Sequence, residues 1–185
     1  MAEHTNMRAV EVTVPLSTKP SRETRYVVAD PYLRFWLSFL GPHLSEIERG
    51  RGDLTMDRID RSWTSWRGRA IEPVVREALR RLPSDHLPAE AATIGGYWTR
   101  TNDPEIDIVG ADRMPVARSI SFVGSVKWQK SRPFDAHDLG RLLLHRSLLP
   151  GADESVPVVA VSRSGTAVDG IRVLSAEDLL TAYRN

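Results

Sequence analysis

Apolar and polar residues alternate most clearly between residues 105 and 128, and this period of two predicts two half-buried β-strands joined by a polar turn. In the second run, one face carries Ile120, Phe122, Gly124, Val126 and Trp128. Ser125 and Lys127 lie on the opposite face. In the first run, Asp107 opposes Ile106 and Ile108. Antiparallel pairing of the two runs would therefore bring Asp107 and Lys127 onto one face.

Helical and extended patterns alternate along the rest of the chain. Amphipathic helices are predicted at residues 30–40, 66–82 and 134–149, with a last helix from residue 176. Further strands are predicted at 10–14, 25–28, 92–101, 156–161 and 171–174. From residue 66 the order is helix, three strands, helix, strand, so the strand after the crossover helix should join the three-strand meander in parallel. The sequence therefore predicts an α/β (α+β) fold with a mixed sheet.

Proline and glycine set the limits of the predicted helices. Asp30 and Pro31 form an N-cap and first-turn pair that starts a helix. Residues 44–61 are highly charged and are predicted to be helical in parts, with breaks at the glycines 50 and 52. Pro73 lies inside the next helical pattern and implies either a kink or a helix start close to residue 71.

Residues 1–45 are predicted to form an appendage to a larger domain at residues 46–185. The appendage would hold a hairpin and one helix with an aromatic stripe of Tyr32, Phe35, Trp36 and Phe39. Two short strands and a helix are too small to bury this stripe, and an exposed apolar patch usually marks an interface. The stripe is therefore expected to pack on a second copy in a homodimer, on an ATPase, or on the chain's own larger domain.

Composition narrows the class of protein. The chain has 185 residues, of which 41% are hydrophobic and 26% are charged, the balance of a soluble globular protein. The net charge of +1 leaves only local patches for polyanions, and the absence of cysteine excludes disulfides and thiolate chemistry. No apolar run approaches the roughly 20 residues that span a bilayer, so a cytoplasmic protein is expected. The histidines lack metal-ligand spacing and there is no P-loop motif.

Three motifs follow one another in an order that a known nuclease superfamily shares. Glu72 lies on a predicted helix, Asp107 on the second strand of the meander and Ser125-Val126-Lys127 on the third. This order resembles the PD-(D/E)XK superfamily, which has a restriction-endonuclease-like core. Residues 25–36 also resemble the segment that follows the winged helix in a family of archaeal and bacterial AAA-type ATPases, whose C-terminal domain of unknown function is thought to have a PD-(D/E)XK-like fold. Residues 66–72, 96–98 and 105–109 resemble the same family. The similarity covers roughly residues 25–163.

The resemblance implies a phosphodiesterase site. A hard cation such as Mg²⁺ would be held by Asp107, Glu72 and the residue at position 125, and Lys127 would orient the attacking water. Glu72 would alternatively position water. The residues expected to contact nucleic acid are Gln129, Lys130 and Arg69. Lys127 is also one of only three lysines in the chain, whereas arginine is common.

The sequence departs from the nuclease pattern at position 125, where Ser replaces Asp or Glu. A hydroxyl is a poor replacement for a carboxylate on Mg²⁺, so metal binding is expected to be weak or absent. Three hypotheses remain. The domain is a catalytically impaired module that binds nucleic acid or regulates an ATPase; it is an active Mg²⁺-dependent DNA endonuclease in which another acid such as Glu105 compensates; or it is a protein-interaction domain of an AAA-type ATPase.

Overall fold

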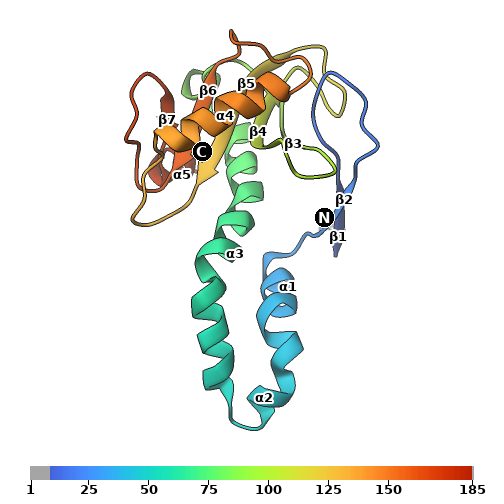
Figure 1. Cartoon of the computed structure of the whole chain (residues 1–185), viewed down its shortest axis with the longest axis vertical. Helices are drawn as coiled ribbons and strands as arrows, with labels where there is room; N and C mark the ends of the chain where they lie inside the picture. The colour runs from blue at the N-terminus through green and yellow to red at the C-terminus, as the bar shows by residue number, and fades with distance from the viewer. Residues whose placement is uncertain (1–8, 185) are drawn as a thin grey trace. The chain divides into compact units, whose positions relative to one another are not determined.

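The computed structural model describes residues 9–184 and divides the chain into two compact units. Unit 1 takes in residues 9–13 and 24–66, and unit 2 takes in residues 14–23 and 67–184. The boundary at residue 66 falls inside the long helix α3, Gly52–Arg81 (Figure 1). Among the described residues, no helix is long and apolar enough to cross a membrane.

Unit 1 begins with the predicted hairpin, in which β1 (Val10–Thr13) pairs antiparallel with β2 (Arg25–Val28). Helix α1 (Pro31–Phe35) starts as expected, because the Asp30 side chain accepts a hydrogen bond of 2.6 Å from the Leu33 amide. The chain continues through a π-helical turn η1 (Trp36–Leu40), a 3₁₀ turn η2 (Gly41–His43) and helix α2 (Leu44–Glu48). Gly50, with a φ of 76°, then separates α2 from α3, which confirms the predicted break.

Two residues of the predicted aromatic stripe, Phe35 and Phe39, pack inside unit 1 against the first half of α3, whereas Tyr32 is exposed. The Phe35 ring lies 5.2 Å from that of Phe39 and 5.6 Å from that of Trp66, and Trp66 stacks on Trp63 at 5.4 Å. The Trp66 indole also donates a hydrogen bond of 3.2 Å to Ser38 Oγ. Helix α3 therefore supplies half of the cluster, because it begins at Gly52 and not near residue 66 as the apolar spacing predicted. Pro73 does not start a helix, since α3 runs through it.

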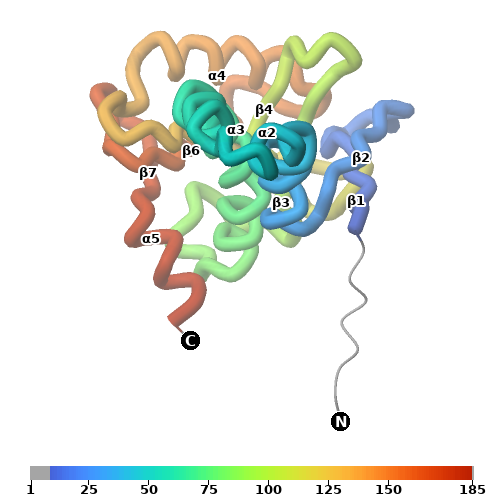
Figure 2. Tube along the Cα trace, turned by 90° about the horizontal axis from the view of Figure 1, so that it is seen from below, coloured from blue at the N-terminus to red at the C-terminus, as the bar shows by residue number. Residues whose placement is uncertain are grey.

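Unit 2 is built on a five-stranded mixed sheet in the order β3-β4-β5-β6-β7. The strands are β3 (Thr93–Trp98), β4 (Glu105–Ala111), β5 (Ile120–Lys127), β6 (Val158–Ser162) and β7 (Arg172–Leu174). The first three pair antiparallel, and β6 joins β5 in parallel after helix α4 (Ala136–Leu148), so the predicted meander and crossover are confirmed. A short 3₁₀ turn η3 (Ser84–His86) precedes the sheet, and β7 leads into helix α5 (Ala176–Thr181) (Figure 2).

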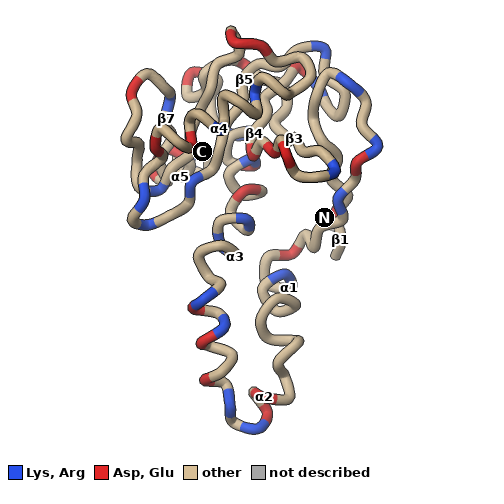
Figure 3. The backbone as a smooth tube through the Cα atoms, viewed as in Figure 1, with Lys and Arg blue, Asp and Glu red and all other residues tan. Residues whose placement is uncertain are grey.

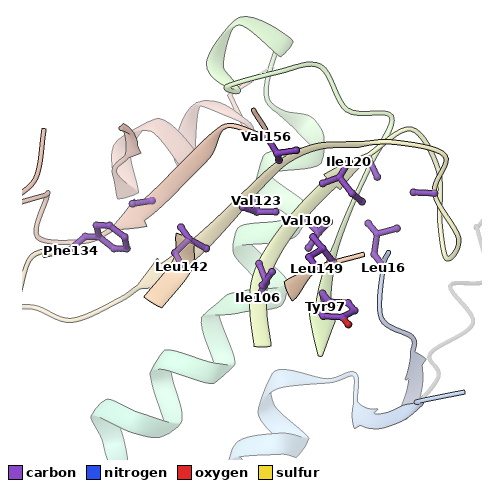
Figure 4. Packing of buried hydrophobic residues seen from close by; sticks show 13 residues of the cluster. Leu16, Tyr97, Ile106, Val109, Ile120, Val123, Phe134, Leu142, Leu149 and Val156 are labelled. Atoms are coloured by element: carbon purple, nitrogen blue, oxygen red, sulfur yellow. The ribbon is translucent and has the colours of Figure 1, made fainter. Parts of the chain in front are cut away.

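Helices cover both faces of the sheet. Helix α4 crosses one face (Figure 1), where Leu142 joins a buried cluster with Val109 and Val123 (Figure 4). The second half of α3 covers the other face, where Val75 and Leu79 pack with Phe122, which is fully buried. Helix α5 adds Leu179 to this second cluster. Unit 2 is therefore a three-layer α/β structure whose sheet has an α4 face and an α3 face.

Two β-bulges interrupt the strict alternation that the sequence predicted. Ile106 belongs to the cluster under α4, whereas Ile108 belongs to the cluster under α3. The prediction that both share one face is wrong, because the pairing of β3 with β4 shifts register between Gly95 and Tyr97. A second shift, between β4 and β5, likewise places Ile120 in the α4 cluster and not beside Phe122.

Residues 14–23 belong to unit 2 although they interrupt unit 1 in the sequence. Leu16 is fully buried in the α4 cluster, and its amide donates a hydrogen bond of 2.9 Å to the carbonyl of Gly96 on β3. The Ser17 carbonyl accepts a hydrogen bond of 2.9 Å from the Ala117 amide. This segment therefore covers the outer edge of β3, the first strand of the sheet.

Candidate functional site

A polar cavity of about 150 Å³ lies on the α4 face of the sheet. Its polar lining includes Glu105, Asp107, Ser125, Asp138, Arg141 and His145. The cavity forms where β4 and β5 separate, because their pairing ends at Ile108 and Gly124 while β5 continues to Lys127 beside β6. Backbone groups of β5 beyond Gly124 are thus free of β4 and need other partners.

The Asp107 carboxylate serves as a hydrogen-bond acceptor for β5 where the pairing of β5 with β4 has ended. Its Oδ2 accepts hydrogen bonds from the Val126 amide at 2.8 Å and from Ser125 Oγ at 3.0 Å. Its own backbone carbonyl accepts a hydrogen bond of 2.7 Å from Arg76 on α3. Burial raises the pKa of the Asp107 carboxyl, and the hydrogen bonds from Val126 and Ser125 offset part of that rise. Asp107 and Ser125 are therefore in direct contact, as their shared face predicted.

Lys127 points to the same face as Ser125 and is held by an acid that the sequence interpretation missed. Its Nζ lies 2.7 Å from Asp138 Oδ1, and the two side chains are 15% and 2% exposed. Asp138 stands at the third position of α4, where it forms a capping box with Asp135, and it also lies 3.4 Å from Arg132. The sequence signal for Asp138 is that of an ordinary helix cap, which is why nothing distinguished it beforehand.

Glu72 lies apart from this cavity. It is on α3, which covers the opposite face, and its carboxylate lies 3.7 Å from Arg76. Arg76 donates a hydrogen bond to the backbone carbonyl of Asp107, so Glu72 is connected to the site indirectly, through Arg76. Glu72 is not among the residues that line the cavity. The ion pair with Glu72 holds Arg76 in its orientation towards the Asp107 carbonyl. The role of Glu72 as a metal ligand stays a prediction.

The residues predicted to contact nucleic acid occupy two places. Gln129 and Lys130 follow the end of β5, where the Gln129 carbonyl accepts a hydrogen bond from Ser164 and Lys130 is exposed. Arg69 is exposed on α3. It is two residues from Arg67, whose guanidinium reaches the carbonyl of Trp128 at 3.3 Å, and residues two apart do not share a helix face.

The side chains around the cavity do not form a ready Mg²⁺ site. Mg²⁺ needs near-octahedral oxygen ligands, and position 125 offers a neutral hydroxyl that is already bonded to Asp107. The charge of Asp138 is shared between Lys127 and Arg132. In the described part of the chain, no group of three or more His, Asp or Glu side chains is arranged to hold a metal ion. Asp107 and Asp138 are thus engaged with donors within the chain, and weak or absent Mg²⁺ binding stays a prediction.

Asp107→Asn is expected to stabilise the protein at neutral pH. The folded-state pKa of Asp107 lies above the unfolded value, so the native state binds more protons between the two values, and the free energy of unfolding falls as pH rises through that window. Asn cannot ionise and keeps an oxygen that accepts from Ser125 and Val126. Urea denaturation at about pH 4 and about pH 7 measures the free energy of unfolding of the wild type and the variant. The variant should be more stable than the wild type at the higher pH and no more stable at the lower.

Asp112→Asn provides a control of opposite sign. Hydrogen bonds from the Ser119 and Arg118 amides lower the pKa of Asp112, so its carboxylate form is favoured in the folded state. This variant should lose stability at neutral pH and lose less at acid pH. An Asp107→Asn protein that is also less stable at neutral pH would show that the ionised form is the one that the fold favours.

The fold and the cavity define an α/β domain with an acid, a hydroxyl and a lysine at the point where two strands separate. The chain belongs to the DUF234 family, described as archaeal and bacterial proteins of unknown function, whose model matches residues 36–139. It is 30% identical over 135 residues to an uncharacterized protein, MJECL04, of Methanocaldococcus jannaschii. That match covers 72% of this chain but spans only 29% of the length of the relative. No solved structure matches the chain significantly.

Proposed function

We propose that unit 2 is a PD-(D/E)XK-like domain that binds nucleic acid without efficient cleavage and acts as a regulatory module beside an ATPase. The observation that carries the proposal is the state of its two most characteristic side chains. Asp107 is bonded to Ser125 and Val126, and Lys127 is held by the buried Asp138. Both groups that hydrolysis would use are thus engaged within the chain.

The chemistry of phosphodiester cleavage explains why this arrangement opposes turnover. Hydrolysis needs a hard cation on carboxylate oxygens and a lysine free to orient water or to stabilise charge on the phosphate. Ser125 adds no charge for the cation, and releasing Lys127 would leave Asp138 buried without its closest cation. A domain with this site retains positive side chains for phosphate contact while lacking the means to cut.

The ATPase part of the proposal rests on sequence resemblance and on length. The segments 25–36 and 66–72 resemble the C-terminal region of AAA-type ATPases. The relative in M. jannaschii extends far beyond the matched segment, since the match spans 29% of it. A module that accompanies a larger partner domain fits both observations.

A plasmid-nicking assay with Mg²⁺ or Mn²⁺ tests the proposal, together with calorimetric titration of Mn²⁺. The wild type is expected to bind Mn²⁺ weakly and to nick no faster than buffer. Ser125→Glu adds a second carboxylate beside Asp107 and should tighten Mn²⁺ binding by about tenfold or more, because affinity follows the charge of the ligands.

Asp107→Ala is the matched control, because it removes the carboxylate that Ser125 and Val126 contact. Rapid nicking by the wild type that Asp107→Ala abolishes would overturn the proposal in favour of an active endonuclease. In that case Asp138 or Glu105, which line the same cavity, would be the next acids to substitute.

A further inference from the structure

The carboxyl ends of β5 and β6 form a surface distinct from the α4 cavity. Because the two strands are parallel, they end at the same edge of the sheet. The chain segments that leave them stay side by side: the Arg163 amide donates a hydrogen bond of 3.2 Å to the Lys127 carbonyl, and Ser164 bonds to the Gln129 carbonyl. We call residues 128–130 and 163–165 the β5–β6 edge.

Basic side chains collect at this edge without acidic partners. Lys130 and Arg163 are exposed and form no ion pair with any residue in the described range 9–184. Arg67 reaches the edge from α3, where it donates to the Trp128 carbonyl at 3.3 Å, and its shielded Nε has no hydrogen-bond partner. The chain as a whole has a net charge of +1, so three such cations are a local excess.

Two cations next to this surface, in contrast, form ion pairs with acids of the chain. Lys127 is neutralised by Asp138, and Arg132 by Asp135 at 2.9 Å. Figure 3 shows Lys and Arg positions along the loop between β5 and α4. Only some of the cations in this region form ion pairs with acids in the described part of the chain. The remaining charge, on Lys130, Arg163 and Arg67, is available for an external anion.

We propose that the β5–β6 edge binds the sugar–phosphate backbone of nucleic acid, with Lys130 and Arg163 contacting phosphates and Arg67 adding positive charge behind them. This inference rests on the proposed nucleic-acid-binding function and names the surface that performs it. Lys130 and Arg163 are exposed on two adjacent segments and line neither of the cavities found in unit 2. Exposed cations on two adjacent segments, outside any cavity, suit a polymer of phosphates better than one enclosed phosphate group.

The binding should not depend on base sequence. Trp128, the aromatic residue of the edge, packs against the core cluster under α3 and is not presented for stacking on a base. Phosphate contacts position a protein without reading sequence. The expected behaviour is therefore weak, salt-sensitive binding that is similar for unrelated duplexes.

Fluorescence anisotropy with a labelled DNA duplex, on the full chain at several salt concentrations, tests the inference. The variant is Lys130→Gln with Arg163→Gln. Each phosphate contact contributes about 0.9 to the slope of log affinity against log salt, so the double variant should lower that slope by about 2 and weaken binding to unrelated duplexes equally.

Arg113→Gln with Arg118→Gln is the charge-matched control, because both residues lie in the turn between β4 and β5, at the other end of β5. An unchanged slope in the control and a reduced slope in the Lys130 and Arg163 variant support the inference. Equal effects of the two variants would overturn it and leave the proposed function standing. No binding of duplex by the wild type would overturn both, and thermal melting of each variant confirms that it is folded.

Discussion

Replacing Asp138 with alanine is expected to lower the free energy of unfolding by about 3–5 kcal/mol, because it leaves a buried ammonium without its counter-ion. Lys127 is only 15% exposed and its nearest acid is Asp138, at 2.7 Å. The same substitution removes half of the capping box that starts α4, which adds about 1 kcal/mol to the loss. Urea denaturation followed by circular dichroism measures the change.

The double variant Lys127→Met, Asp138→Leu separates the ion pair from the other contacts of Asp138. It buries no unpaired ammonium, so it should recover much of the stability that Asp138→Ala loses. Lys127→Met alone should also cost stability, because Asp138 then keeps only the longer contact of 3.4 Å to Arg132. A double variant as unstable as Asp138→Ala would show that the cap and the packing of α4, and not the charge pair, account for the loss.

Phe39→Ala is expected to destabilise unit 1 by about 3–5 kcal/mol, the range for removing a buried aromatic ring. Phe39 is 6% exposed, and its ring lies 5.2 Å from Phe35 and 5.7 Å from Trp66. The loss should appear as a change in the fluorescence of Trp63 and Trp66, which stack on each other in the same cluster.

Tyr32→Ala is the control for Phe39, because Tyr32 is 71% exposed. Its substitution should change stability by no more than about 0.5 kcal/mol. Light scattering on the wild type and on both variants also tests the homodimer expectation. A dimer that Tyr32→Ala dissociates, with unit 1 still folded, would contradict an internal role for the stripe and restore it as an interface.

Local signals in the sequence predicted most of the secondary structure. The Asp30-Pro31 pair fixed the start of α1, and the continuous apolar run at 156–161 indicated the buried strand β6. The crossover helix before β6 predicted parallel pairing with β5, which the structure has. These features depend on neighbouring residues, so a single chain is enough to find them.

Long-range features escaped prediction. The bulge opposite Gly95 and Tyr97 separates Ile106 from Ile108, and it depends on how β3 pairs with β4. The partner of Lys127 was missed for the same reason, since Asp138 contacts it only after α4 folds back over the sheet. The contact between Asp107 and Ser125 was within reach because both lie on strands that the meander brings together.

The segment at residues 14–23 constrains how this protein can be dissected in the laboratory. A fragment cut at residue 46, between the aromatic helix and the rest, would discard Leu16 and its hydrogen bond to Gly96. The bared edge of β3 would then be open to strands from other molecules, and such fragments tend to aggregate. A minimal version of the sheet should therefore keep residues 14–23 and join them, through a linker that replaces residues 24–66, to the chain beginning near residue 67.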